Sequence, residues 1–216
     1  MARILITSGP TRQYLDPVRF LTNASSGRMG CALAAAAVAH GHEVVVVSGP
    51  VQIDYPHGAR LVHVVNTEEM LEACRREFPS CDGLIATAAP CDYRPQHVAA
   101  KKISKTGQPL LLQLIETPDI VATLAAEKRP AQWMVGFALE THDRHIRAMV
   151  KLEKKSCDLM VLNGPEAINA EENAVEVMDG AGHVVFTAAG SKASVAHGIF
   201  DVIQRRLIDG RGSCRA

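Results

Sequence analysis

Glu43-Val-Val-Val-Val-Ser48 is a near-continuous β-branched run, which is typical of a parallel strand covered on both faces. An alanine-rich helix is predicted just before it, over residues 27–40, and Gly41 is well suited to the position after a helix end. Residues 3–7 form another buried apolar run ahead of that helix. Strand, helix and strand in this order indicate a parallel unit of an α/β protein.

The alternation of strands and helices continues along the chain. A turn over residues 179–182 joins two short runs, 174–178 and 183–187, and predicts a C-terminal β-hairpin. We therefore expect an α/β fold with a Rossmann-like, doubly wound and mostly parallel sheet. The further predicted strands are 60–65, 83–88, 132–139 and 158–163, and the further predicted helices are 67–78, one that has Pro118 in its first turn and Thr117 as its cap, 142–155 and 191–208.

The length of the chain bounds its domain organisation. The 216 residues suit one α/β domain, which we place at residues 1–209. Residues 98–116 break the alternation and contain a basic cluster, so they are predicted to form a flap or a dimerisation arm. Residues 210–216 are predicted to be a frayed tail.

Composition excludes several classes of protein. Apolar residues make up 47% of the chain, which indicates a packed globule rather than disorder. Lys plus Arg and Asp plus Glu both number 23, so no overall basic field favours nucleic acid or an acidic membrane. No apolar run reaches membrane-spanning length, and the N-terminus lacks the pattern of an export signal. The six cysteines include no Cys-x-x-Cys pair, so we expect reduced thiols in a cytoplasmic protein without a structural metal.

The segment that enters the first helix has the chemistry of a phosphate site. Ser25, Ser26 and Gly27 stand where this helix begins, and they are expected to supply cap groups and bare backbone. The first-turn amides of a helix lack partners within it and favour an anion, and Arg28 adds a positive charge. The alternative is an ordinary loop before a helix, which binds nothing.

Other candidate ligand groups stand where the predicted parallel strands end, which is where such sheets bind ligands. Small residues around Ala88 leave backbone exposed, and Asp92 suits a ribose hydroxyl, a magnesium ion or simply a turn. Phe137 either stacks on a base or belongs to the core, and Lys102 and Lys151 face either phosphates or water. No nucleophile is paired with a histidine, so a reaction that depends on positioning and charge neutralisation fits best.

Several motifs follow one another in a fixed order along nearly the whole chain. The most specific block runs from Asp16-Pro-Val-Arg19 to Asn23-x-Ser-Ser-Gly-x-Met-Gly30. The others are Gly9-Pro-Thr-Arg12, Val47-Ser-Gly-Pro50, Ala88-x-x-x-Asp92-Tyr-Arg-Pro95, Lys102-Ile-x-Lys105, Thr117-Pro-Asp119-Ile, Gly136-Phe-Ala-x-Glu140-Thr141, Asp158-Leu-x-Val-x-Asn163 and Glu172-Asn173. Together these motifs resemble those of the phosphopantothenoylcysteine synthetase family.

This resemblance implies a ligase of coenzyme A biosynthesis that joins 4′-phosphopantothenate to L-cysteine. In the family a nucleoside triphosphate, with CTP expected here and ATP as the alternative, converts the pantothenate carboxylate into an acyl-nucleotidylate and releases pyrophosphate. The cysteine amine then attacks the activated carbonyl, and CMP leaves. Mg²⁺ and lysines offset the charge on the phosphates. The resemblance also implies a homodimer in which the flap of one chain contributes to the neighbour's site.

The resemblance further implies the roles of individual residues. Asn23 is implied in turnover of the acyl-cytidylate, Lys102 in contact with the triphosphate, and Arg19 beside them, so these three are the expected catalytic residues. Asp92 is also the expected magnesium ligand. The expected phosphate-binding residues are Ser25, Ser26, Gly27 and Arg28, and the expected nucleotide-binding residues are Gly9, Ala86, Ala88, Asp92, Ile115, Glu116, Thr117, Pro118, Phe137 and Lys151.

The chain departs from the family pattern at several places. Pro90 and Cys91 stand where members usually have Val and Ala or Ser, and Pro90 removes one backbone donor. Arg28 replaces a usual lysine, and residues 167–171 are altered. Many bacterial members are fused behind a flavin-dependent decarboxylase, for which this chain has no room. We therefore expect a stand-alone synthetase or the second half of a longer protein, with such a decarboxylase as its functional partner.

Two alternative functions compete with the ligase. A Rossmann-type NAD(P) oxidoreductase is disfavoured, because Gly-x-Gly-x-x-Gly does not follow the first strand and no acidic residue closes the strand that ends at Ser48. The other is a nucleotide-binding protein that lost turnover through Pro90 and Cys91.

Overall fold

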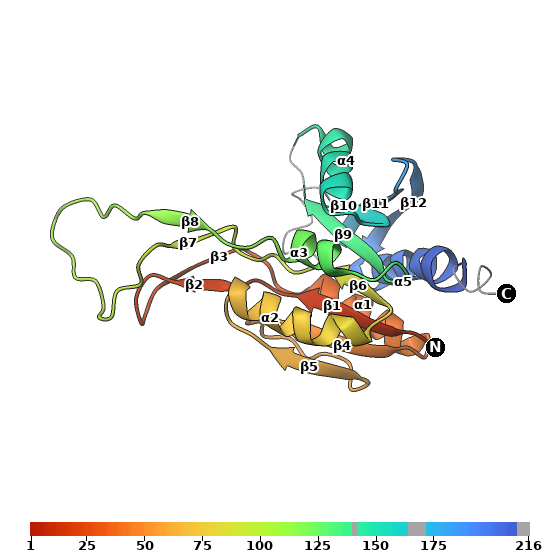
Figure 1. Cartoon of the computed structure of the whole chain (residues 1–216), viewed down its shortest axis with the longest axis horizontal. Helices are drawn as coiled ribbons and strands as arrows, with labels where there is room; N and C mark the ends of the chain where they lie inside the picture. Colours follow the sequence, from red (N-terminus) through yellow and green to blue (C-terminus); the bar gives the residue numbers. More distant parts are fainter. Residues whose placement is uncertain (140–141, 164–171, 211–216) are drawn as a thin grey trace.

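The structure is a computed structural model of the chain, and it describes residues 1–139, 142–163 and 172–210. Its centre is an eight-stranded sheet in the order β12-β11-β10-β9-β6-β1-β4-β5 (Figure 1). The strands of this sheet are β1 (Arg3–Ser8), β4 (Glu43–Ser48), β5 (Ala59–His63), β6 (Gly83–Ala86), β9 (Trp133–Leu139), β10 (Leu159–Asn163), β11 (Glu172–Asp179) and β12 (Val184–Ser191).

The direction of the strands confirms the predicted fold class. The neighbours from β5 to β10 all pair in parallel, whereas β11 is antiparallel to both β10 and β12, as the predicted hairpin requires. The helices of the main layers are α1 (Arg28–Ala39), α2 (Thr67–Glu77), α3 (Ile120–Glu127), α4 (Arg144–Lys154) and α5 (Lys192–Ile203). A short 3-10 helix, η1 (Phe78–Ser80), follows α2, and a π-helix, η3 (Gln204–Asp209), follows α5.

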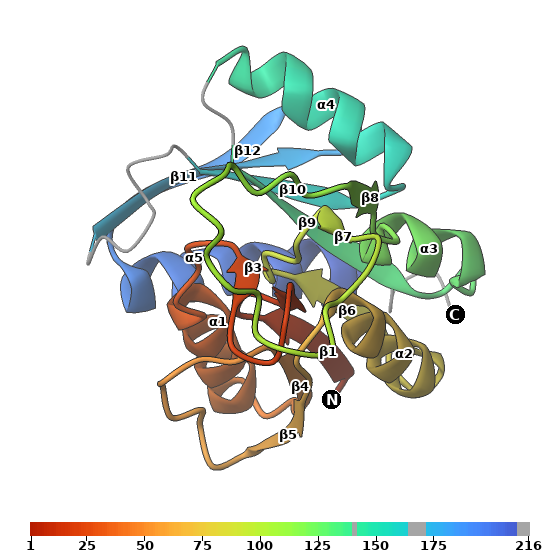
Figure 2. The same cartoon turned by 90° about the vertical axis from the view of Figure 1, so that its left-hand side faces the viewer.

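Helices cover both faces of the sheet and bury two separate cores (Figure 2). Side chains of a strand alternate between faces, so Ile4 and Ile6 of β1 pack against α1 and α5, while Leu5 between them belongs to the core under α2, α3 and α4. Two-sided burial explains why β1 and β4 consist of uninterrupted apolar residues rather than an alternating pattern.

The position of β1 determines where a ligand can bind. The chain passes from β1 to β4 and β5 on one side, and then returns to place β6, β9 and β10 on the other. The loops after β1 and β6 therefore turn toward opposite faces and leave a crevice at the carboxyl ends of these strands. In open α/β sheets, this switch point is the usual ligand site.

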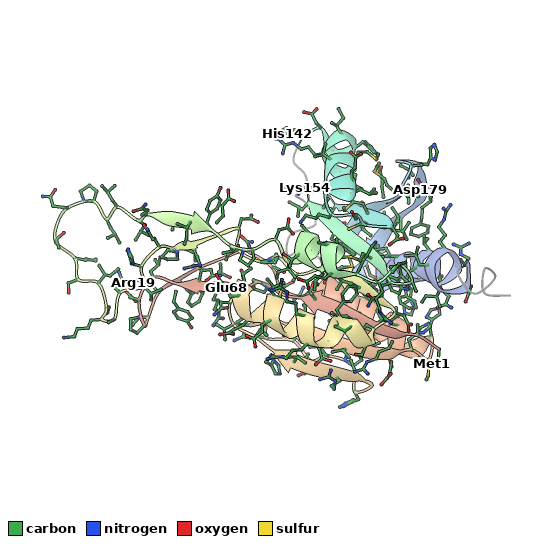
Figure 3. The ribbon with its side chains drawn as sticks, in the orientation of Figure 1. Met1, Arg19, Glu68, His142, Lys154 and Asp179 are labelled. Carbon is green, nitrogen blue, oxygen red and sulfur yellow. The ribbon has the colours of Figure 1, made fainter. Side chains whose placement is uncertain are left out.

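An arm projects from the same edge of the sheet (Figure 1). We define the arm as residues 12–22, which hold the antiparallel pair β2 (Arg12–Tyr14) and β3 (Phe20–Thr22), and residues 93–116, which begin with β7 (Tyr93–Pro95) and end with β8 (Leu114–Glu116). At its base, Glu68 of α2 accepts a hydrogen bond from Gln13 at 3.0 Å and forms an ion pair with Arg94 at 2.9 Å (Figure 3). The arm is thus larger than the predicted 98–116 segment, because it includes the β2–β3 hairpin.

Two predicted helix starts are wrong in detail. Helix α1 follows Gly27, whose φ of 75° is left-handed, and no described side chain caps it, so Ser25 and Ser26 do not act as caps. Helix α3 is capped by Asp119, which accepts from the Ala122 amide at 3.1 Å. Pro118 precedes that helix, and the Thr117 hydroxyl instead donates to the Cys91 carbonyl at 2.6 Å. The predicted tail beyond Gly210 lies outside the described residues.

The contact of α1 with the sheet yields a stability prediction. A Cβ at Gly30 would lie 2.3 Å from Ser8 Oγ and 2.6 Å from Thr87 Oγ1. We expect Gly30→Ala to lower the free energy of unfolding by about 1–3 kcal/mol, as overpacking of a tight contact does. Urea unfolding monitored by circular dichroism measures it. The control is Gly180→Ala, where a Cβ would meet nothing within 4 Å. Equal midpoints for both variants would contradict the prediction.

Candidate functional site

Two adjoining cavities open at the carboxyl ends of the central strands. Cavity A has a volume of about 300 Å³ and reaches toward α3 and α4, and cavity B has a volume of about 490 Å³ and reaches toward the start of α1. The residues that line both cavities are Ala88, Asp92, Phe137 and Lys151. One elongated ligand can therefore occupy both cavities across this shared wall.

Cavity A brings together most of the residues predicted to bind a nucleotide. These are Ala86, Ala88, Asp92, Glu116, Thr117, Pro118, Phe137 and Lys151. Ile115 and Gly9 are not among the described residues that line either cavity. Ile115 pairs with Arg94 between β7 and β8, and the Gly9 carbonyl accepts from the Ala89 amide at 2.9 Å.

Cavity B contains the predicted phosphate-binding turn, Ser25 to Arg28, at the start of α1. We call these four residues the anion turn. Because no described side chain caps α1, its first-turn amides face the cavity without a competing side-chain acceptor. The Ser8 hydroxyl, at the end of β1, donates to the Gly27 carbonyl at 3.1 Å and links this turn to the sheet. Backbone donors, a helix N-terminus and the Arg28 charge give this end of cavity B the chemistry of an anion site.

Asn23 joins the phosphate-binding turn to the loop after β6. Its side-chain amide donates to the carbonyls of Ala89 and Pro90 at 3.2 and 2.8 Å, and its own carbonyl accepts from the Ser25 amide at 2.9 Å. These bonds hold the Asn23 carboxamide at the wall of cavity B, between the anion turn and the wall that the two cavities share.

The unusual Pro90-Cys91 pair lies in a tightly bonded loop. The Cys91 amide donates to the Thr11 hydroxyl at 2.8 Å, and the Cys91 carbonyl accepts from the hydroxyls of Thr67 and Thr117. The Pro90 carbonyl accepts from Asn23, while Pro90, which lines cavity A, offers no amide to a ligand there. Burial raises the pKa of the Cys91 thiol, which keeps it protonated and unsuited to act as a nucleophile.

Cations surround both cavities. Lys151, Lys154 and Lys155 from the end of α4 line cavity A, where Lys155 also forms an ion pair with Asp119 at 3.3 Å. Arg28 and Lys192 line cavity B. Lys192 is not among the residues predicted from the sequence. Its burial and, to a smaller extent, the neighbouring Arg28 charge lower its pKa. In cavity A the three lysines are matched by Asp92, Glu116 and Asp119, whereas in cavity B the described lining has three cations and one carboxylate, Asp92. The field in cavity B therefore favours an anionic ligand, although the whole chain is neutral.

Asn163 also lines cavity B, from the end of β10. Its Oδ1 atom is buried and finds no hydrogen-bond partner among the described residues, so it can accept from a ligand. A polar residue at the end of a parallel strand is a visible signal in the sequence. Lys192 has no comparable signal in the sequence, because it reaches this edge of the sheet only after the antiparallel strands β11 and β12.

Arg19 and Lys102 are not among the described residues that line the two cavities. Arg19 pairs with Asp16. Figure 3 shows Arg19 on the arm, away from Lys154 on α4. Lys102 is exposed in the loop between β7 and β8. Within one chain the three expected catalytic residues are thus separated, and only Asn23 lies at the cavities.

The fit to magnesium is limited. Within residues 1–139, 142–163 and 172–210, no group of three or more His, Cys, Asp or Glu side chains could hold a metal ion. Asp92 offers one exposed carboxylate at the shared wall. Mg²⁺ often takes one or two carboxylates with the remaining ligands from phosphates and water, so the site suits a metal ion that binds together with a phosphate-bearing ligand.

None of the described helices is long and apolar enough to span a membrane.

A doubly wound sheet with a ligand-sized crevice at its switch point is the architecture of a Rossmann-like α/β protein. The sequence profile described as the C-terminal domain of the DNA/pantothenate metabolism flavoprotein matches residues 1–207. The chain belongs to this family.

Several curated relatives are named CoaBC, a coenzyme A biosynthesis bifunctional protein. The chain is 44% identical over 179 residues to the coenzyme A biosynthesis bifunctional protein CoaBC of Vibrio cholerae, covering 80% of this chain and 45% of that protein. It is 40% identical over 206 residues to CoaBC of Bacillus subtilis, covering 93% of this chain and 50% of that protein. The chain therefore spans about half the length of these curated relatives. A crystal structure of the C-terminal domain of CoaBC superposes with a TM-score of 0.81 at 37% identity, covering 96% of both chains.

Lys192 gives a prediction for binding. We expect Lys192→Met to weaken binding of a nucleoside triphosphate roughly tenfold to a hundredfold, since hydrogen bonds to charged groups contribute about 1.5–3 kcal/mol. Isothermal titration calorimetry with CTP measures the dissociation constant. The control is Arg76→Met, which removes an exposed cation that pairs with Glu72 on α2. An unchanged affinity for Lys192→Met would show that the cation does not meet the ligand.

Proposed function

We propose that the chain catalyses the ligation of 4′-phosphopantothenate to L-cysteine through an acyl-cytidylate, with CTP as the nucleotide. The observation that carries this proposal is the joining of the two cavities. The anion turn at Ser25–Arg28 lies in one and the small residue Ala86 lines the other, while Ala88, Asp92 and Phe137 belong to both. Membership of the flavoprotein C-terminal domain family supports it.

The chemistry of this reaction suits such a site. A carboxylate is a poor electrophile until one of its oxygens becomes a good leaving group, which attack on the α-phosphorus of a nucleotide achieves. The chain's tasks are to bring carboxylate and phosphorus together and to neutralise the phosphates. We assign the amides at Ser25–Gly27 and the Arg28 charge to a phosphate, and Lys151 to the nucleotide. Magnesium, held by Asp92 and the phosphates, would supply further positive charge.

We assign the acyl-cytidylate to Asn23. Its side chain is anchored by two carbonyls of the loop after β6 and stands between the anion turn and the shared wall. In that place its amide is oriented before the ligand arrives, which reduces the cost of organising the transition state. We place the base of the nucleotide against the backbone of residues 115–118 and against Phe137, and selection of CTP over ATP is part of this proposal.

We further propose a homodimer in which the arm of one chain supplies Lys102 to the neighbour's cavities. Lys102 is exposed on the arm, outside the described lining of its own cavities. The arm also exposes apolar side chains, among them Leu111, which is 92% exposed. Because the chain spans about half of its CoaBC relatives, a flavin-dependent decarboxylase is the proposed functional partner, and we place both in the cytoplasm.

Product formation tests the ligase directly. We expect pyrophosphate release from CTP on addition of phosphopantothenate, and CMP release only when cysteine is also present. Asn23→Ala should lower the turnover number by about a hundredfold or more, the scale typical for loss of one preorganised polar group at the reacting centre. Pyrophosphate release with CTP replaced by ATP measures the nucleotide preference. Binding of NADPH without binding of CTP would support the oxidoreductase, and CTP binding without pyrophosphate release would support a protein without turnover.

A mixing experiment tests the shared site. Lys102→Gln and Asn23→Ala chains are each expected to keep only a small residual activity as homodimers. Unfolded together in equal amounts and refolded, they should recover roughly a quarter of the wild-type activity, because half of the dimers are mixed and each mixed dimer has one intact site. Light scattering measures the dimer. Recovery that does not exceed the sum of the separate variants would contradict a site built from two chains.

A further inference from the structure

Asp16 is a fully buried carboxylate at the base of the β2–β3 turn, where burial of an unpaired charge is costly. Its Oδ1 atom accepts from the amides of Val18 and Arg19 at 2.8 and 3.0 Å. Its Oδ2 atom accepts from the Arg19 guanidinium through both Nε and Nη2. The paired geometry of guanidinium and carboxylate is directional, so Arg19 is held in one orientation.

The same carboxylate reaches across the arm. Asp16 Oδ2 also accepts from the Ile103 amide at 3.1 Å, and Arg19 Nη2 donates to the Ile103 carbonyl at 2.7 Å. Both backbone groups of Ile103 are therefore bonded to one ion pair far away in sequence. We call these three residues, Asp16, Arg19 and Ile103, the Asp16 network.

The Asp16 network contacts the loop between β7 and β8 at Ile103, beside Lys102. Ile103 directly follows Lys102, and it lies within the basic cluster Lys101–Lys105. A second tie, from the Ala99 amide to the Leu15 carbonyl at 2.9 Å, lies four residues upstream of Ile103. The described contacts of the loop with the β2–β3 hairpin are thus concentrated just before and just after Lys102.

Burial alone would raise the pKa of Asp16, but hydrogen bonds from Ile103, Val18 and Arg19 together hold that pKa well below its usual range. A lowered folded-state pKa means that the stabilisation is complete above the ordinary aspartate value, near pH 4, and is lost as the pH falls through the folded value. The network is consequently intact throughout the neutral range.

We propose that Asp16 is a positioning residue, which acts through Arg19 and the Ile103 backbone to hold Lys102 in the geometry needed at the triphosphate. This proposal rests on the proposed function, in which Lys102 meets the nucleotide. An exposed loop would otherwise lose conformational entropy each time the lysine is placed. In this proposal Arg19 links Asp16 to the loop between β7 and β8. This role accounts for its position away from the cavities.

A double-mutant cycle in the full chain tests this role. We expect Asp16→Asn, which keeps the shape and removes the charge, to lower kcat with CTP about tenfold to a hundredfold, as expected for misplacement of a catalytic group by about 1 Å. In a Lys102→Gln background, the same substitution should cost nothing further, since it acts through that lysine. Glu127→Gln, which breaks the exposed Arg75–Glu127 pair, is the matched control and should leave kcat unchanged. Equal losses in both backgrounds would overturn the proposal.

Hydrogen exchange gives a readout that does not depend on ligase activity. In the wild-type protein the Ile103 amide should exchange slowly, and in Asp16→Asn its exchange should accelerate at least tenfold while the amides of β1 stay protected. Arg19→Lys, which keeps the charge and loses the fork, is the second variant if Asp16→Asn does not fold, and it should accelerate the same amide. Unchanged Ile103 exchange in a folded variant would overturn the network. Slow exchange in a wild-type protein without ligase activity would instead refute the proposed function alone.

Discussion

The parallel pairing of β1 with both β4 and β6 is the constraint on which the rest of the structure depends. Parallel strands bring their carboxyl ends to one edge, and the reversal of strand order at β1 sends the adjoining loops to opposite faces. Thr7, Ala88 and Phe137 therefore meet at one crevice although they are far apart in sequence. The cavity-lining residues Arg28, Asn163 and Lys192 come to the same edge from the start of α1, the end of β10 and the start of α5.

A second constraint fixes the loops above that edge. Thr11 and Thr67 bond to each other through their hydroxyls at 2.9 Å, and Thr11, Thr67 and Thr117 all bond to the backbone of Cys91. The first loop of the sheet, the start of α2, the loop after β6 and the segment before α3 are thereby joined at one point. Since Asn23 takes its orientation from the carbonyls beside Cys91, its position depends on this set of hydroxyl bonds. The Pro90-Cys91 departure is accommodated by the same bonds.

The sequence predicted those features that have a local signal. Strands such as β4 can be predicted from their β-branched runs. The location of Asp92 at the cavities could be predicted because strand ends in a parallel sheet share an edge. The β2–β3 hairpin has no such signal, because its strands are three residues long and it is held by contacts of Phe20, with the Arg12 guanidinium 4.5 Å from its ring centre and the Tyr14 ring at 5.4 Å. Lys192 was missed because its place depends on how two antiparallel strands return the chain.

The charge around the cavities decides how a metal can enter. Arg28, Lys151 and Lys192 converge on cavity B, where Asp92 supplies a carboxylate at the wall shared with cavity A. A bare divalent cation would meet net repulsion there, whereas a phosphate-bearing ligand would be attracted and would bring oxygens of the kind that Mg²⁺ prefers. A site of this charge therefore favours the anionic ligand as the first to bind, with any magnesium entering on its phosphates. The chain's overall neutrality conceals this local field, because the balancing carboxylates lie mostly elsewhere, in pairs such as Arg75–Glu127.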